Sequence, residues 1–371
     1  MEPNQPLSVR FRVLGLMALV MVTADVFAHA DASFIGPLNT VTTLNSTIPS
    51  NGDVNPYGVA LVPETKGNLV AGRFLISNFN NYMNQQGTGT TIVQIAPDGT
   101  FSLFAQIDPN RVFCPGGIGL TTALVALHSG FVVVGSLPTV HGDVTTAGAG
   151  CLIVLNSWGN VVETFSGHHI NGPWDMTAVE NGTLAELFVT NVLNGTVAAN
   201  GNVVNGGTVI RLLLGVFDGA PPQLLDSTVI ASGFPERTDP AALVIGPTGV
   251  AFDDESGILY VADSLDNRIA AIPDALYRIF TAGTGFTVSQ GGALNDPLGL
   301  ALTPNHHIVA ANGDDGNLVE INPGSGQQVA VKLVDSTPPP PLGAGALFGL
   351  IVTPDGVYFV DDDSNTFNLL N

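Results

Sequence analysis

Basic side chains are scarce in this sequence. Only 10 of its 371 residues are Lys or Arg, against 31 Asp and Glu, so the formal net charge is −21. A surface of this sign repels phosphate backbones, which excludes nucleic acid as a partner and disfavours an anionic membrane surface. Divalent cations, basic proteins and small neutral or cationic ligands remain as partners.

Helical periodicity is also missing. We find no amphipathic stretch of helical period longer than about ten residues, the length that argues for a helix. The chain contains 44 Gly and 25 Pro, which separate many short apolar runs. This pattern predicts an all-β sandwich, barrel or propeller.

The N-terminal segment has the pattern of a targeting signal. Arg10 and Arg12 form a basic region directly before an apolar run over residues 13–23. The triplet Ala28-His29-Ala30, which has the pattern of a cleavage site, follows this run. The run is too short to span a bilayer, so we predict no membrane span and a secretory signal peptide, residues 1–30, cleaved near Ala30. The protein would then be secreted, periplasmic or held in the cell envelope; a retained N-terminal anchor is the alternative. Asn-x-Ser/Thr triplets, which carry glycans only in a eukaryotic secretory route, begin at Asn45, Asn181 and Asn194.

Cysteine is almost absent. The two cysteines are Cys114 and Cys151, and in an exported protein an even count allows one disulfide. The repeat described below places both on one face of one repeat. Alternate strands of a sheet lie about 9.6 Å apart, however, which is beyond disulfide reach unless the loops bend inward. Two alternatives therefore stay open: a disulfide between Cys114 and Cys151, or two cysteines that are not bridged.

What the sequence does contain is a short phrase that recurs six times, as in NPYGVALV and GPTGVAFD. Each copy is followed by a second apolar run that ends in a small polar residue. Spacings of about 40–50 residues and more are typical of four-stranded propeller blades with loop insertions. We therefore predict one β-propeller domain over residues 31–371. Its blades begin near residues 55, 114, 172, 246, 296 and 346.

The sixth repeat stops after its third strand. The stretch LNTVTTL, residues 38–44, has the pattern of a lone strand before the first repeat. We expect it to supply the missing fourth strand, because pairing the two chain ends would close the ring and cover both sheet edges.

The clearest copy, GPTGVAFDDESGILYVADSLDNRIAAI at residues 246–272, resembles the NHL-repeat β-propeller family. The chain is more distantly similar to gluconolactonase-like and paraoxonase-like propellers. NHL-like propellers include extracellular scaffolds and recognition domains, and related six-bladed families include metal-dependent lactonases and lyases. The resemblance implies the fold and leaves the function open between these classes.

In such a blade the inner strand begins, and the second strand ends, on one face of the ring, which we call the loop face; the opposite face is the turn face. Five of the six second strands end in an amide or carboxylate. Such oxygens suit Ca²⁺, and the lactonase-like resemblance implies ligands in this region. The alternative is that each side chain bonds to its local backbone. The candidate metal ligands are Asn78, Asp175, Asn191, Asp263, Asn312 and Asp361.

The third repeat departs from the pattern because Asp175 replaces the usual Gly. An inner-strand carboxylate is costly to bury unpaired, and the lactonase-like resemblance implies an acidic metal ligand near the start of an inner strand. We predict a loop-face site with His168, His169 and Asp175 as catalytic candidates, against the alternative of a satisfied surface loop. The ligand-binding candidates are Trp174, Asp175, Asn191 and His141. Residues 194–207 are expected to form a hairpin over the same face.

Two functions follow as hypotheses. The first is an exported, non-enzymatic binding or scaffold protein that uses its loop face. The second is a divalent-metal-dependent hydrolase or lyase of the lactonase-like kind. Convergence of several side-chain oxygens within about 2.5 Å of one point would support the second, and bonding to local backbone would argue against it.

Overall fold

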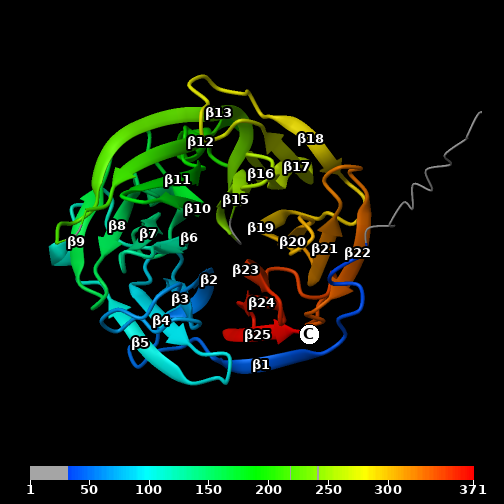
Figure 1. The fold of residues 1–371 in the computed structure, drawn as a ribbon, viewed down its shortest axis with the longest axis horizontal. Coiled ribbons are helices and arrows are strands. Elements are labelled where there is room, and N and C mark those ends of the chain that lie inside the picture. Colours follow the sequence, from blue (N-terminus) through cyan, green and yellow to red (C-terminus); the bar gives the residue numbers. More distant parts are fainter. Residues whose placement is uncertain (1–31, 218, 240–241) are drawn as a thin grey trace, which may run out of the picture. The chain divides into compact units, whose positions relative to one another are not determined.

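The computed structural model describes residues 32–371 except 218 and 240–241, so the predicted signal peptide lies outside the described residues. Residues 33–371 form a ring of six antiparallel sheets around a central axis (Figure 1). The predicted six-bladed, all-β propeller is confirmed. Among the described residues, no helix is both long and apolar enough to cross a membrane.

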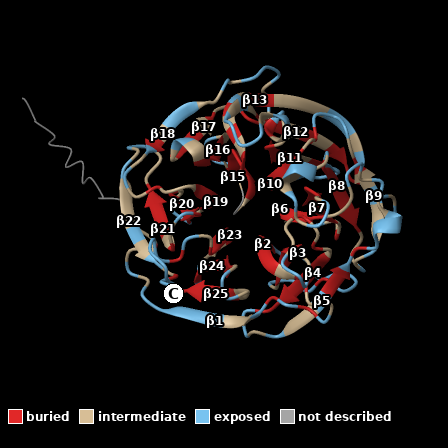
Figure 2. Ribbon diagram, turned by 180° about the vertical axis from the view of Figure 1, so that it is seen from behind, coloured by how far each residue is buried: buried red, intermediate tan, exposed pale blue. Residues whose placement is uncertain are grey.

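Each blade is a meander that runs outward from the axis. The first three blades comprise β2 (Val54–Leu61), β3 (Phe74–Asn80), β4 (Thr91–Ile95) and β5 (Phe101–Gln106); β6 (Leu120–Ala126), β7 (Val132–Ser136), β8 (Cys151–Leu155) and β9 (Val161–Phe165); and β10 (Pro173–Asn181), β11 (Leu184–Asn191), β12 (Val204–Gly215), β13 (Gln223–Asp239) and β14 (Leu243–Ile245). The last three comprise β15 (Pro247–Asp253), β16 (Ile258–Asp263), β17 (Arg268–Ile272) and β18 (Phe286–Gln290); β19 (Pro297–Leu302), β20 (Ile308–Asn312), β21 (Asn317–Ile321) and β22 (Gln328–Leu333); and β23 (Leu347–Thr353), β24 (Gly356–Asp361), β25 (Thr366–Leu370) and β1 (Val41–Ser46). The inner strands are largely buried, whereas β1, β18 and β22 on the outside are mostly exposed or half-buried (Figure 2).

The glycine of the recurring phrase is required by the crowding of neighbouring inner strands. A Cβ atom on Gly249 would run into the carbonyl of Leu298, and one on Gly299 would run into the carbonyl of Phe348. Only a residue without a side chain fits where two backbones approach this closely. The strands therefore converge toward the axis near the loop face.

The second blade begins later than the phrase predicts. Its inner strand starts at Leu120, because residues 114–117 form a turn in which Gly117 has a φ of +110°. The turn brings Cys114 beside the start of β8, and the structure joins Cys114 to Cys151 in a disulfide with Cα atoms 5.4 Å apart. The loop thus bends inward in the way that the bridge requires.

The N-terminal strand closes the ring, as predicted. β1 pairs antiparallel with β25 and places Val41 opposite Leu370. The strand begins three residues later than the expected 38–44 and extends to Ser46. Because β1 is in the same sheet as β23 to β25, the sixth blade contains both ends of the propeller domain.

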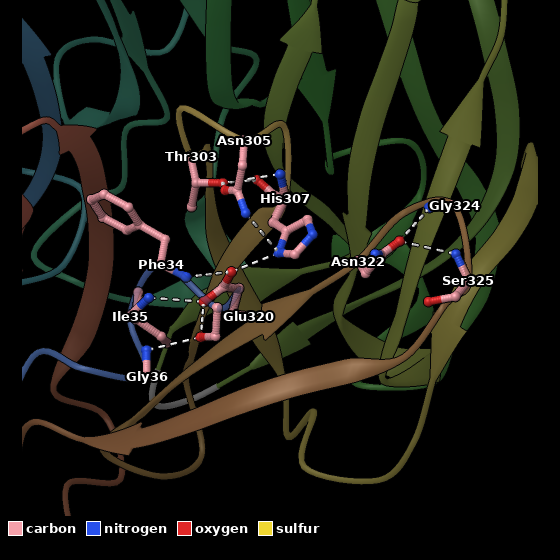
Figure 3. A network of polar contacts seen from close by, with 11 residues as sticks. Phe34, Ile35, Gly36, Thr303, Asn305, His307, Glu320, Asn322, Gly324 and Ser325 are labelled. Carbon is pink, nitrogen blue, oxygen red and sulfur yellow. Dashed lines mark hydrogen bonds and ion pairs between the residues drawn. The ribbon is translucent and has the colours of Figure 1, made fainter. Parts of the chain in front are cut away.

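One buried carboxylate fixes the segment that leads to β1 (Figure 3). Glu320 on β21 accepts hydrogen bonds from the backbone nitrogens of Phe34 (2.9 Å) and Ile35 (2.8 Å) and from the Ser33 hydroxyl (2.5 Å), and it lies 2.6 Å from Nδ1 of His307. Burial raises the pKa of Glu320, but these hydrogen bonds outweigh burial and leave the pKa below its ordinary value.

The third blade carries an extra strand that was not predicted. β13 is 17 residues long, and its end pairs with β14 so that Asp239 lies opposite Leu243. Leu243 and Val244 are buried in the apolar cluster at the loop-face end of the channel. The hairpin expected over residues 194–207 is wrong: the segment contains the one-turn helix α1 (Thr196–Ala199), bounded by left-handed residues at both ends, and then enters β12.

Candidate functional site

The loop-face end of the central channel is filled by side chains. Tyr57, directly after the proline of the first repeat, stacks on Phe348 at 3.9 Å and on Phe79 at 4.5 Å between ring centroids. Trp174 is 3% exposed and belongs to the same cluster, together with Leu243 from β14. Trp174, predicted to contact a ligand, is therefore part of the apolar core that closes this end.

A cavity of about 930 Å³ opens instead on the turn face. All six inner strands line it, and its walls include Leu124, Met176, Phe252, Leu300 and Leu350. Its floor lies two residues past the start of the inner strands, and its rim is formed by the turns that follow them. The floor residues are Thr122, Asp175, Gly299 and Gly349, and the charged rim residues are Glu64, Lys66, His128 and Glu180.

Asp175 places a carboxyl group on this floor. Its Oδ1 accepts a hydrogen bond from the Met176 nitrogen (2.8 Å), and its Oδ2 accepts one from the Val250 nitrogen on the neighbouring inner strand (3.0 Å). The side chain is 9% exposed. Burial raises the pKa of Asp175 to about 7, although both backbone hydrogen bonds lower it. The group therefore titrates near neutral pH at the base of an apolar cavity.

A hydroxyl group shares the floor. Thr122 on β6, like Asp175 on β10, lies two residues past the start of its inner strand, and it is 3% exposed. The Thr122 Oγ1 has no hydrogen-bond partner among the described residues. A buried hydroxyl without a partner is unfavourable by about 1–3 kcal/mol, so it is available to a bound molecule.

The charges at the rim are paired with one another. Nδ1 of His128 lies 2.6 Å from Oε2 of Glu180, and Nζ of Lys66 donates to the His128 carbonyl at 3.0 Å. Lys66 also lies 3.9 Å from Glu64. The charged rim side chains therefore contact one another rather than Asp175, whose hydrogen-bond donors are backbone nitrogens.

The predicted grouping of Asp175 with His168 and His169 does not form. Both histidines lie beside the outer strand β13, where the Ser227 hydroxyl donates to the His168 carbonyl. β10 and β13 are separated by two strands, a distance of about 14 Å. His141 lies on an exposed turn of the loop face, so it is on the face opposite the cavity.

The ring of strand ends is engaged locally. Four of these side chains bond to the backbone of their own blade or of the segment that enters it, as the alternative interpretation expected, whereas Asp263 bonds to a side chain. Asn78 donates to the Thr47 carbonyl, Asn191 accepts from the Asn171 nitrogen, Asn312 accepts from the Asn295 nitrogen, Asp361 accepts from the Ser364 nitrogen, and Asp263 binds Arg268. Burial raises the pKa of Asp263 and of Asp361 to about 6.

These contacts do not fit a shared calcium site. The oxygens of Asn191, Asn312 and Asp361 point to backbone nitrogens of their own connections rather than to a common point. Among the described residues, no group of three or more His, Cys, Asp or Glu side chains is arranged to hold a metal ion. We therefore derive no chemistry from a metal at this ring.

Sequence reasoning identified Asp175 but assigned it to the wrong end of the channel. It missed Thr122 and the turn-face rim. A signal was available, because the residue after the phrase proline is large and apolar in several repeats, as in Tyr57, Trp174 and Leu298. Side chains of this size at one level of converging strands fill the axis there and leave space only below them.

No family model matches the sequence, and no curated protein matches it. Solved structures with the same fold include a gluconolactonase from Xanthomonas campestris (14% identity, 89% of this chain and 88% of that chain, TM-score 0.51). They also include the PQQ-bound aldose sugar dehydrogenase from Streptomyces coelicolor (15%, 91% and 100%, 0.52) and a calcium-binding protein, regucalcin, from Agrobacterium tumefaciens (12%, 87% and 92%, 0.51). At these identities the likeness is one of fold: the chain is a six-bladed β-propeller similar in architecture to these proteins.

Proposed function

We propose that this propeller binds a small molecule in the turn-face cavity and acts on it as a hydrolase or lyase, with Asp175 as the acid–base group. The observation that carries the proposal is a buried carboxyl at the floor of a cavity of about 930 Å³. Small-molecule sites are typically apolar clefts of this size with a few polar groups. The likeness to gluconolactonase supports an enzyme over a loop-face scaffold.

The position and pKa of Asp175 suit general acid–base catalysis. A group with a pKa of about 7 is present in both protonation states at neutral pH, which is the condition for accepting and returning a proton. With an ester or lactone, the carboxylate would take a proton from water as the water oxygen bonds to the carbonyl carbon. The protonated carboxyl would then return that proton to the leaving alkoxide oxygen as the C–O bond breaks.

The test is turnover of a panel of lactones and aryl esters by the purified protein. We expect Asp175→Asn to lower kcat/KM at least about 100-fold, because the amide accepts no proton from water. Asp355→Asn is the matched control, since it removes one exposed carboxyl from the same face. Unchanged turnover in Asp175→Asn would contradict the catalytic role.

A second candidate is binding without chemistry. It is favoured by the hydrogen bond that Asp175 accepts from the Val250 nitrogen, which ties β10 to β15 and gives the carboxyl a structural role. Specific binding without turnover of any panel member would support it. Absence of binding to the cavity would contradict both candidates.

Export, predicted from the N-terminal segment, is tested separately by N-terminal sequencing of the protein recovered outside the cytoplasm.

A further inference from the structure

We propose that the ligand of the turn-face cavity is an apolar amine whose ammonium group is held on the floor by the Asp175 carboxylate. The inference rests on the proposed function, because it assigns a chemical class to the molecule that the same cavity takes. It deepens the candidate of binding without chemistry, since a carboxylate that holds an ammonium group is not free to take a proton from water. It commits to a cation with an apolar body, rather than to an acid or a neutral molecule.

The floor supplies acceptors for an ammonium group. Each Asp175 oxygen accepts one backbone hydrogen bond, and a carboxylate oxygen has a second lone pair. Thr122, at the same level of the neighbouring blade, adds a hydroxyl with no partner among the described residues. An ammonium group carries three donors and no acceptor, so it matches a carboxylate and a hydroxyl better than a neutral hydroxyl ligand does.

The walls supply apolar contacts for the rest of the molecule. Met176, Phe252, Leu300 and Leu350 line the cavity above Asp175 on four different blades. An alkyl or aryl body that extends from the floor toward the rim would contact these side chains and leave water. Apolar burial contributes roughly 25 cal/mol per Å², so the body provides affinity and the floor provides selection.

The charges in the cavity select against anions. Among the described lining residues, the cationic groups are Lys66 and, when protonated, His128, and both are at the rim in contact with other protein groups. Three carboxyl groups, those of Glu64, Asp175 and Glu180, line the same cavity. With a net charge of −21, the whole chain adds a potential of the same sign. A carboxylate ligand would meet repulsion from rim to floor.

The experiment compares three probes of one shape on the full chain. Phenylbutylamine, phenylbutanol and phenylbutyrate share the apolar body and differ in the terminal group. We expect the amine to bind at least about tenfold more tightly than the alcohol, and the carboxylate to bind most weakly, by calorimetry at neutral pH. This comparison needs no variant, so it holds even if substitutions on the floor impair folding.

Variants then locate the preference. Asp175→Asn is expected to remove the advantage of the amine over the alcohol, and Thr122→Val to reduce it. Asp355→Asn, which lowers the net negative charge by the same amount on the same face, is expected to keep it.

Equal binding of amine and alcohol, or a preference for the carboxylate, would overturn the inference while leaving a binding cavity in place. No binding of any probe, together with no turnover in the ester and lactone panel, would overturn the proposed function as well. The two failures are therefore distinguishable. An amine preference that persists in Asp175→Asn would also overturn the inference, because the cation would then bind elsewhere.

Discussion

Buried carboxyl groups in this propeller differ in the group that compensates them. Asp175 has backbone donors, whereas Asp263, which is fully buried, has a cation. Arg268 reaches Oδ2 of Asp263 through Nη2 (2.7 Å) and Nε (3.0 Å). Burial raises the pKa of Asp263 to about 6 even though the hydrogen bonds and charge of Arg268 lower it. Loss of the arginine would leave an uncompensated charge in the core.

We predict that Arg268→Met destabilises the protein by about 3–5 kcal/mol at pH 8, the usual result of removing one partner of a buried ion pair. Without Arg268 the pKa of Asp263 rises further, so the carboxyl is neutral at pH 5 and the loss is smaller there. Denaturant unfolding at the two pH values measures both effects.

Arg111→Met is the control for this prediction. Arg111 lies 4.0 Å from Asp108 and is 71% exposed, so its removal is expected to leave the unfolding midpoint unchanged. An equal loss of stability for Arg268→Met at pH 5 and pH 8 would show that packing, rather than the charge of Asp263, determines the effect.

At the scale of elements, strands that repeat are predictable and inserted strands are not. The inner strands follow the phrase because Pro begins the strand and Gly permits close approach, and both needs recur in most blades. In the part of the chain that the structure describes, β14 has no counterpart in another blade. The only sequence feature that pointed to β14 was the long spacing between the third and fourth copies of the phrase. This spacing indicated inserted residues but not where they pack.

The candidate site was less predictable for the same reason. The residue type of Asp175 marked it as unusual, but its neighbours depend on which end of the channel is filled. That is decided by side-chain volumes from several blades together with Leu243 of β14. His168 and His169 are near Asp175 in sequence, but strand order places them on the outside of the ring. Proximity in sequence is a poor guide to proximity in space in this fold, because each blade runs from the central axis to the outside of the ring.

β14 gives a prediction at this scale. Leu243 is fully buried in the cluster that closes the channel and has a φ of +63°. We predict that Leu243→Ala destabilises the protein by about 2–4 kcal/mol, because the cluster loses contacts that it cannot replace. Leu225→Ala is the control on β13: Leu225 is 50% exposed, so its truncation is expected to change the unfolding free energy by about 0.5 kcal/mol or less. Similar losses for the two variants would argue that β14 does not close the channel.

At the scale of the whole molecule, the buried and half-buried carboxyl groups of the described residues outnumber the cations that compensate them. Burial is the main cause that raises the pKa of each of six groups above its ordinary value. These are Asp263 and Asp361 to about 6, Asp175 and Asp296 to about 7, and Glu236 and Asp362 to about 8. Glu320 and Asp253 are opposite cases, because their hydrogen bonds lower their pKa values. The balance of these groups sets how stability depends on pH.

A carboxyl with a raised pKa keeps its proton in the folded state after the unfolded chain has lost it. The folded protein then binds more protons, so stability falls as pH rises from the unfolded pKa to the folded pKa. The six groups therefore predict a melting temperature that declines from about pH 5 to about pH 8. Below about pH 4.5 the trend reverses for Glu320, whose contribution is lost as pH falls through its lowered pKa.

Glu236 allows this to be tested with one substitution. It is fully buried, and its Oε1 accepts a hydrogen bond from the Asn194 nitrogen at 2.8 Å. Its pKa rises from 4.5 to about 8, so it alone accounts for roughly 4 kcal/mol of stability lost between pH 5 and pH 8. Glu236→Gln cannot titrate and is expected to flatten the decline, whereas Glu163→Gln, at an exposed position on β9, is expected to leave it unchanged. A melting temperature that rises from pH 5 to pH 8, or an equal slope in both variants, would mean that these carboxyls are already ionised in the folded protein. The acidity of the chain would then act through surface repulsion rather than through its buried groups.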